Sequence, residues 1–299
     1  MIRGTLALKL PGGQRHAGRL GFLGLVLAYA LLVSVALATL SAQGDLSLGR
    51  QPWQNLVKTA NEFAHPSFLD VWFGNPKLEY RSEDGTLLRT EDRRAVEAGY
   101  LRQLTGAAWM TFVIGTLGSL LGALLALPLG VLTARNLGVT RYARLPAKAV
   151  LDTARAIHSL VFGLILVGIV GLGPTAGILA IAFHSLGTYG KLYAEAIETL
   201  DMQAIEAVRA VGASPLQVFS SAVWPAVLPQ FVSAHLYIWE FNIRDSTVLG
   251  LIGAGGLGML ITEATSLFQW GRLATLLIVL VAMVAAFDAL SARIRKALL

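Results

Sequence analysis

The chain contains no cysteine and few charged residues. Of its 299 residues only 14% are Asp, Glu, Lys or Arg, whereas 55% are hydrophobic. The lack of cysteine excludes disulfide bonds, thiol catalysis and thiolate metal sites. A soluble domain carries roughly 25% charged residues, so the shortage of charge indicates a membrane protein. The mean hydropathy of +0.63 agrees with this interpretation.

Catalytic and metal-binding motifs are also missing. Neither G-x-S-x-G nor H-E-x-x-H occurs, and no two histidines have the spacing of three or four residues that would face one metal ion on a helix. We therefore predict no catalytic residue and no metal site. Three of the histidines fall in or beside apolar runs, where a bundle-facing hydrogen bond is favoured over a proton relay. The five histidines are His16, His65, His158, His184 and His235.

Two glycine-rich segments imitate nucleotide-binding loops. Residues 253–258 match G-x-G-x-x-G, but a dinucleotide site also needs a βαβ unit and an acidic residue about 20 positions further on. The next acid is Glu263, and the segment lies between two apolar runs. Residues 187–191 lack the phosphate-loop spacing, and Leu192 stands where Ser or Thr must bind magnesium. We expect a flexible glycine turn at 253–258, and any ATP must bind to another chain.

The net charge of +6 does not indicate a nucleic-acid partner, because the basic residues flank apolar runs instead of forming one patch. This distribution is typical of the positive-inside rule. The groups are Arg3, Lys9, Arg15 and Arg19, then Arg135, Arg141, Arg144 and Lys148, then Arg293, Arg295 and Lys296. The first apolar run resembles a signal peptide, but it reaches the ~20 residues that cross a bilayer, which favours a retained helix.

We expect an all-α membrane protein with about six transmembrane helices. They are predicted at 20–41, 107–133, 150–171, 175–194, 226–250 and 273–292. The basic groups place the N-terminus (1–19), the 134–149 loop and the C-terminus in the cytoplasm. The segments 172–174 and 251–272 then lie outside, and 195–225 lies inside. Gly118 and Gly122 form a G-x-x-x-G pair, for which packing within one subunit is favoured over a dimer seam.

The segment 42–106 is predicted to be periplasmic, and its charges have mixed signs. A solvated hairpin or short helices is the simpler interpretation. A docking surface for an external partner is the alternative.

A short polar hairpin is predicted within 195–225. Good helix formers occupy 202–211, and Gly212 supplies a left-handed position at the helix end. Ser214 is a natural N-cap and Pro215 a natural first helical residue, so a second helix begins at once. Pro225 marks the entry to the fifth span. Such a hairpin is either a lever that docks on a soluble protein or an ordinary amphipathic connector.

The fifth span carries charge. Glu240 and Arg244 are four residues apart with the acid first, the favourable order for a helical ion pair. A charge near the bilayer centre costs on the order of 2.5–3.5 kcal/mol. The pair either fixes the rotation of the helix or lets Arg244 line a route for an anion, because a guanidinium fork matches phosphorus oxyanions.

These motifs resemble the permease subunit of ABC importers for phosphonates and related reduced phosphorus oxyanions. The block from Glu206 to Gly212, with Pro225 downstream, resembles the cytoplasmic "EAA" loop of bacterial import permeases. Segments 171–177, 190–198, 237–250 and 253–258 are similar to the phosphonate branch. The likeness covers about residue 107 to the C-terminus. Val208, Trp224 and Ser159 depart from the family pattern, and Ser159 leaves the substrate open.

The resemblance implies a type I ABC importer (MetI-like) permease fold in 107–299 and multi-pass insertion in the bacterial inner membrane, with both termini cytoplasmic. The implied function is ATP-driven import of phosphonate, phosphite or a related oxyanion by alternating access, without chemistry by this chain. The implied partners are a second copy of the chain, a cytoplasmic ATPase dimer that holds ATP and Mg, a periplasmic or lipid-anchored solute-binding protein, and membrane lipid.

The residues expected to carry this function fall in two groups. Those expected to couple to the ATPase are Glu206, Ala207, Gly212, Ser214, Pro215 and Pro225. Those expected in the pathway or gate are Glu240, Asn242, Arg244, Ser246 and Thr247. The alternatives are the same machinery for an amino acid or an inorganic anion, an ion-driven secondary transporter, and, least favoured, a membrane-embedded enzyme.

Overall fold

The computed structural model describes residues 14–43, 51–73, 77–81, 84 and 86–298, and it is mostly helical. The chain divides into two compact units, residues 1–58 and 59–299. The first unit contains α1 (Gln14–Gln43) and the beginning of α2 (Pro52–Phe63). The expected cytoplasmic N-terminus falls largely on residues 1–13, which lie outside the described residues, as do the basic Arg3 and Lys9.

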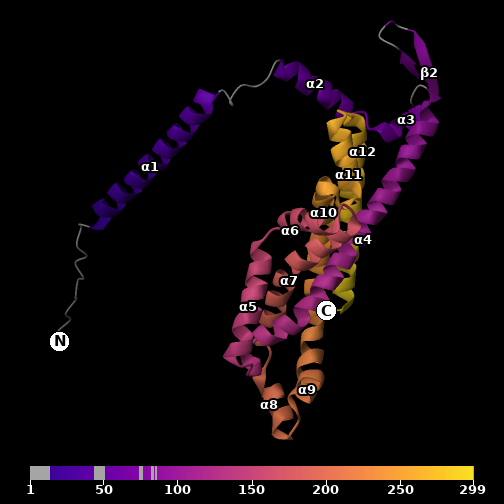
Figure 1. Cartoon of the computed structure of the whole chain (residues 1–299). Helices are drawn as coiled ribbons and strands as arrows, with labels where there is room; N and C mark the ends of the chain where they lie inside the picture. Colours follow the sequence, from indigo (N-terminus) through magenta and orange to yellow (C-terminus); the bar gives the residue numbers. More distant parts are fainter. Residues whose placement is uncertain (1–13, 44–50, 74–76, 82–83, 85, 299) are drawn as a thin grey trace, which may run out of the picture. The chain divides into compact units, whose positions relative to one another are not determined.

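The second unit holds the helical bundle (Figure 1). A short outer part precedes the bundle and consists of η1 (Ser67–Leu69), α3 (Asp70–Phe73), β1 (Lys77–Arg81) and β2 (Leu87–Asp92). The bundle consists of α4 (Arg93–Thr133), η2 (Arg135–Leu137), α5 (Arg141–Ala156), α6 (Ser159–Val170), α7 (Pro174–Glu198), α8 (Met202–Ala210), α9 (Pro215–Val218), η3 (Phe219–Val223), α10 (Trp224–Leu249), η4 (Gly250–Ala254), α11 (Leu257–Ser266) and α12 (Trp270–Leu298).

The described part of segment 42–106 contains short helices and a hairpin, as the simpler interpretation predicted, and a docking role for it stays a prediction. Strands β1 and β2 pair antiparallel with Lys77 opposite Asp92, and an irregularity follows Tyr80. The fold is therefore mostly helical rather than purely all-α. Helix α4 also begins at Arg93, earlier than the expected residue 107.

Long-range contacts explain the early start of α4. The Asp92 carboxylate accepts a hydrogen bond from the Arg94 backbone N–H at 3.0 Å and caps the helix. Arg93 Nη2 lies 2.5 Å from Asp70 Oδ2 in α3. Arg272 in α12 donates to Glu97 at 3.1 Å and lies over the ring of Tyr100 at 4.6 Å. These contacts anchor the polar first turns, which hydropathy alone assigns to a loop, while Glu97 Oε2 and the Tyr100 hydroxyl have no hydrogen-bond partner among the described residues.

The described helices do not give six simple spans. Three are long and apolar enough to cross a membrane, namely Phe22–Ala42, Arg93–Thr133 and Trp270–Ala297, and the described part has up to five if each of two bent pairs counts as one. Helix α7, expected as a span, is not among them. Helix α7 lies at the centre of the bundle and buries small and polar side chains such as Ser185 and Tyr189. Its sequence is therefore less apolar than that of the three long helices.

The expected continuous span 150–171 is wrong. Helices α5 and α6 meet at a bend of 95°. Ile157 is extended, and His158 caps α6 by accepting from the Leu160 N–H through Nδ1 at 3.2 Å. His184 of α7 holds the bend, since its Nδ1 lies 2.8 Å from the Ile157 carbonyl oxygen. His184 therefore bonds within the bundle, as the sequence predicted, whereas His158 is exposed and, within the described part of the chain, bonds only the neighbouring Ser159 and Leu160.

Glycines bring α4 against α7. A Cβ on Gly118 would lie 2.7 Å from the Cβ of Ile181, and one on Gly122 would lie 3.0 Å from the carbonyl oxygen of Ala182. The G-x-x-x-G pair is thus buried inside one subunit, which confirms the favoured interpretation. Further along α4, a Cβ on Gly130 would lie 2.9 Å from Tyr193. Tyr193 in turn stacks on Phe231 of α10 at 4.1 Å, so α4, α7 and α10 form the core.

The two ends of the bundle differ. Figure 1 shows α8 and α9 at one end, where the α4–α5 link also lies. Asn136 in that link donates to the Ile197 carbonyl at 2.6 Å. At the other end, Gly173 donates to the Gly253 carbonyl at 3.0 Å, which joins the α6–α7 and α10–α11 turns. The 134–149 loop and the 195–225 segment therefore share a side, as their charges indicate.

The glycine-rich segment 253–258 is a turn and not a nucleotide loop. Gly253, Gly255 and Gly256 have φ values of 96°, 91° and 72°, in the region that favours glycine. Ala254 and Leu257 beside them are buried, so the turn is packed against the bundle. The sequence alone predicts a flexible turn here. The segment 251–272, expected as a plain outer connection, also contains α11.

Candidate functional site

The exposed face of α10 carries the expected ion pair. Arg244 Nη2 lies 2.6 Å from Glu240 Oε1, one helical turn away. The Arg244 side chain is 53% exposed, whereas that of Glu240 is 15% exposed. Asp288 of α12 lines the same cavity as Arg244. The sequence therefore predicts the pair correctly, and the structure adds a second carboxylate nearby.

Asn242 lies on another side of α10 and joins three helices. Its Nδ2 donates to Ser119 Oγ of α4 at 2.7 Å and to Ser185 Oγ of α7 at 2.8 Å. The residue is 1% exposed. Tyr189 of α7 similarly bonds His235 Nδ1 of α10 at 3.0 Å, so the third expected histidine also bonds within the bundle. These bonds fix the rotation of α10 against α4 and α7.

The remaining expected pathway residues do not share the Arg244 face. Ser246 donates to the carbonyl oxygens of Ile243 at 2.7 Å and Thr111 at 3.0 Å, and it is buried. Thr247 is also buried, and its hydroxyl has no hydrogen-bond partner within the described residues. The structure thus places Glu240 and Arg244 together and sets Ser246 against α4.

A small cavity of about 220 Å³ opens between α7 and α10. His184, Thr188 and Asn242 supply its polar groups, and Tyr237 and Phe241 supply aromatic walls. Sequence reasoning missed the α7 side of this cavity. The sequence does contain a signal for it. His184 and Thr188 are one helical turn apart and interrupt an otherwise apolar run, so they share one face of the helix.

The hairpin of α8 and α9 has the local structure that its sequence predicts. Gly212 has φ 83°, and its N–H donates to the Arg209 carbonyl at 2.9 Å. Ser214 and Gln217 form a capping box, in which Ser214 N donates to Gln217 Oε1 at 2.8 Å. Pro215 is the first residue of α9. Two short helices are thereby joined by a rigid corner.

The tip of the α8–α9 hairpin is apolar and exposed. Val211 is 83% exposed and Leu216 is 77% exposed, on either side of the corner. Glu206 and Ala207 are exposed on α8, and Pro225 is exposed at the beginning of α10. A π-helical turn, η3, joins α9 to α10 and is not evident from the sequence. The hairpin therefore presents an unpartnered surface at one end of the bundle.

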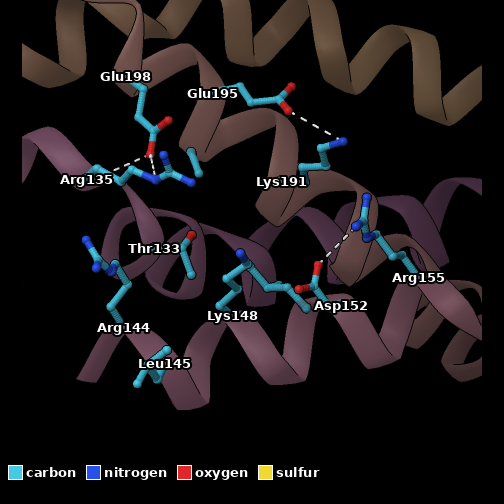
Figure 2. Close-up of a pocket in the computed structure, with 12 residues that line it drawn as sticks. Thr133, Arg135, Arg144, Leu145, Lys148, Asp152, Arg155, Lys191, Glu195 and Glu198 are labelled. Atoms are coloured by element: carbon cyan, nitrogen blue, oxygen red, sulfur yellow. Dashed lines mark hydrogen bonds and ion pairs between the residues drawn. The ribbon is translucent and has the colours of Figure 1, made fainter. Parts of the chain in front are cut away.

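A larger charged cavity of about 530 Å³ lies between α5 and α7 (Figure 2). Arg144 and Lys148, which the sequence marks only as orientation signals, line it together with Arg155 and Lys191. Sequence reasoning missed this site, although Arg144, Lys148 and Arg155 recur at a spacing that puts them on one side of a helix. Across the described residues, no group of three or more His, Asp or Glu side chains could hold a metal ion.

Comparisons with known proteins agree with this geometry. Residues 126–299 match the family described as "Binding-protein-dependent transport system inner membrane component". The chain is 39% identical over 194 residues to the phosphite transport system permease protein PtxC of Stutzerimonas stutzeri, which covers 63% of this chain and 70% of that protein. It is 37% identical over 192 residues to the phosphate-import permease protein PhnE of Mycolicibacterium smegmatis, covering 64% of this chain but only 36% of that protein.

A solved structure shows the same fold. The chain resembles an inward-facing conformation of the MetNI methionine ABC transporter with a TM-score of 0.61 and 24% sequence identity, and the match covers 67% of this chain and 98% of that one. The expected MetI-like permease fold is therefore confirmed. The family is one of inner-membrane transport components, so the alternatives of a secondary transporter and a membrane-embedded enzyme are set aside.

ATP and its hydrolysis accordingly belong to a separate ATPase subunit, and a solute-binding protein is implied by the family. The chain belongs to the family of binding-protein-dependent transport system inner membrane components and is the multi-pass permease subunit of an ABC importer.

Proposed function

We propose that the permease imports phosphite, phosphonate or a related phosphorus oxyanion, and that two copies of the chain enclose the passage. The observation that carries this proposal is the position of Arg244, half exposed toward the C-terminal end of α10. A guanidinium binds oxyanions through paired N–H donors. The phosphite and phosphate named for the two relatives above are small oxyanions of this kind.

The exposed face of α10 supports a homodimer. Tyr237, Phe241 and Val248 lie exposed on this face beside Arg244. A charged side chain facing lipid at the bilayer centre costs on the order of 2.5–3.5 kcal/mol, so charge on an exposed face of a span favours a partner protein or a water-filled passage there. A second copy of the chain placed against it would supply both, with Glu240 and Arg244 of each copy lining the passage.

The α8–α9 hairpin is the proposed contact with the ATPase. Glu206, Ala207, Gly212, Ser214, Pro215 and Pro225 are the proposed coupling residues. The rigid corner and the exposed Val211 and Leu216 suit insertion into a groove of a soluble subunit. The hairpin end then faces the cytoplasm, which places the C-terminus there and agrees with its basic last turn, Arg295 and Lys296. Arg15 and Arg19, which precede the first apolar run, support a cytoplasmic N-terminus as part of the same proposal.

The proposed pathway beyond the ion pair includes Asn242, Ser246 and Thr247. Asn242 borders the cavity between α7 and α10, which supports its role directly. Ser246 and Thr247 are buried beside it, so their proposed part is to hold α10 in place rather than to touch the solute. Segment 42–106 would lie at the periplasmic entrance, where the binding protein delivers its solute.

Reconstitution tests the proposal. The permease, its ATPase and its binding protein are placed in vesicles that enclose ATP, and the uptake of phosphite, methylphosphonate, phosphate and methionine is compared. We expect uptake of one or more of the phosphorus oxyanions that depends on both ATP and the binding protein. Uptake of methionine alone, or of no phosphorus oxyanion, would replace the proposed substrate class with another small solute.

A further inference from the structure

The charged cavity between α5 and α7 has more positive than negative groups. Its five cations face three carboxylates, so positive charge is in excess. The cations are Arg135, Arg144, Lys148, Arg155 and Lys191. The carboxylates are Asp152, Glu195 and Glu198. A concave site lined mainly by one sign of charge focuses the field and raises the local concentration of small counter-ions.

The packing of α5 on α7 fixes the helix positions from which these cations project. Leu151 is buried between the helices, and a Cβ on Gly187 would lie 2.5 Å from the Leu151 carbonyl oxygen. Without side chains at Gly187 and Gly190, α5 therefore approaches α7 closely at this level. Arg144 and Lys148 lie two turns and one turn before Leu151 and share the cavity with Ala194 and Glu198, nearer the hairpin end.

Two of the cations have no carboxylate partner. Figure 2 shows ion pairs between Arg155 and Asp152 at 3.1 Å and between Lys191 and Glu195 at 3.5 Å. Glu198 accepts from the Arg135 backbone N–H at 2.9 Å. Arg144 and Lys148 make no ion pair with any residue that the structure describes. Both point their charge at a cavity that an anion can enter.

The existing pairs do not block an anion. The side chains of Arg155, Asp152, Lys191 and Glu195 are all exposed by more than a third. Exposed pairs of this kind are worth about 0–1 kcal/mol. A small oxyanion can therefore compete for Arg155 and Lys191, and the three carboxylates keep its binding weak enough for release.

The cavity has neighbours toward the centre of the bundle. Asp152 and Arg155 also line a second pocket with Thr188. Thr188 in turn lines the cavity that contains His184 and Asn242. Three neighbouring pockets with shared lining residues therefore follow α5 and α7 from the hairpin end to Asn242.

We propose that the cavity between α5 and α7, here called the inner vestibule, binds the transported phosphorus oxyanion at the last stage of its passage, with Arg144 and Lys148 as its ligands. This inference rests on the proposed function. Arg144 offers a planar fork of donors, and Lys148 offers a mobile point charge. Together they compensate a doubly charged tetrahedral anion before it leaves on the hairpin side.

The absence of cysteine from the chain permits a direct binding test. Thr133→Cys supplies a single thiol in the lining of the vestibule and keeps both proposed ligands, and Arg141→Cys supplies a control on α5 outside the vestibule. The complete transporter in neutral phosphatidylcholine vesicles is treated with an anionic thiosulfonate, and labelling of this chain is followed by mass. We expect phosphate, at constant ionic strength, to slow labelling at position 133 by about threefold or more and to leave position 141 unchanged. Equal rates with and without phosphate at position 133 would overturn the proposal.

Transport provides the second readout. The double variant Arg144→Gln and Lys148→Gln should lower ATP-dependent oxyanion uptake by roughly tenfold, because both compensating charges are lost. Arg141→Gln should leave uptake unchanged. Protection at position 133 combined with normal uptake in the double variant would put the anion off the route and overturn the proposal.

The outcomes separate this inference from the proposed function and from lipid binding. If the Arg141→Gln complex imports no phosphorus oxyanion, the proposed function fails whatever happens at position 133. If it imports the anion but the vestibule shows neither protection nor a loss of uptake, only the vestibule fails. Repetition with phosphatidylglycerol distinguishes a headgroup, because a vestibule protected by anionic lipid and not by phosphate is a lipid site.

Discussion

Asn242 of α10 donates a hydrogen bond to the hydroxyl of Ser119 on α4 at 2.7 Å, and both side chains are buried. The same amide reaches Ser185 of α7, so one residue ties the three central helices together. The residue also borders the cavity between α7 and α10. The network therefore joins the stability of the bundle to the shape of the proposed pathway.

Replacement of Asn242 by Ala should lower the free energy of unfolding by about 1–3 kcal/mol, because two buried hydroxyls lose their partner. Unfolding of the purified transporter by a denaturing detergent measures the change. Thr265→Val is a suitable control, since Thr265 is exposed and bonds only within its own helix, to the Ile261 carbonyl at 2.7 Å. Equal effects of the two variants would show that the Asn242 network adds no stability.

Gly118→Ala should destabilise the bundle by about 1–3 kcal/mol, the usual cost of overpacking a close contact. The added Cβ would lie 2.7 Å from the Ile181 side chain, so one of the two helices must move. Gly106→Ala on the same helix is the control, because a Cβ there meets nothing within 4 Å. It should be neutral or stabilising by about 0.5–1 kcal/mol. The midpoint of thermal unfolding compares them, and a stable Gly118→Ala protein would contradict the close packing.

Local patterns in the sequence are enough to predict some of these features. The corner at Gly212 and Ser214 depends on residues within one or two turns, and the Glu240–Arg244 pair depends on a spacing of four. The glycines of α4 are predictable as a packing surface because their spacing puts Gly118 and Gly122 on one face. In each case the interacting groups are close in the sequence or repeat with the helical period.

Features that depend on distant residues could not be predicted. The polar beginning of α4 is held by Asp70 and Arg272, far away in the sequence. The bend at Ile157 is held by His184 of another helix, whereas hydropathy shows only one continuous apolar run. Arg144 and Lys148 look like orientation signals until α7 is packed beside them. Hydropathy measures the free-energy cost of inserting a residue into the membrane. It says nothing of the partner residue whose contact offsets that cost.

Gly212→Pro should uncouple ATP hydrolysis from uptake. Proline fixes φ near −65°, whereas Gly212 has φ 83°, and proline also removes the N–H that bonds the Arg209 carbonyl. We expect ATP-dependent uptake to fall by roughly tenfold or more per folded transporter, because the corner of the hairpin is lost.

The control for Gly212 is Gly138→Pro, which changes another left-handed glycine, φ 74°, outside the hairpin. Solute binding to the isolated binding protein should be unaffected in both experiments. If uptake with Gly212→Pro is intact, the hairpin is a connector and not a lever.

Arg244→Gln should reduce oxyanion uptake more than Arg244→Lys. Lysine keeps the positive charge and can still pair with Glu240, whereas glutamine leaves that carboxylate without its partner at 2.6 Å. Loss of a hydrogen bond between charged groups costs about 1.5–3 kcal/mol, enough for a loss of roughly tenfold or more with glutamine. Initial rates of uptake at several concentrations of solute measure the two variants.

Glu240→Gln separates contact with the solute from bracing of the helix. If Arg244 only braces Glu240, removal of the carboxylate should impair uptake as strongly as Arg244→Gln does, because each change breaks the same pair. If Arg244 meets the anion, Glu240→Gln should retain most of the uptake, since the guanidinium stays charged and gains freedom to bind. Equal uptake by Arg244→Gln and Arg244→Lys would show that the charge itself is not used, and Arg244 would then be a packing element of α10.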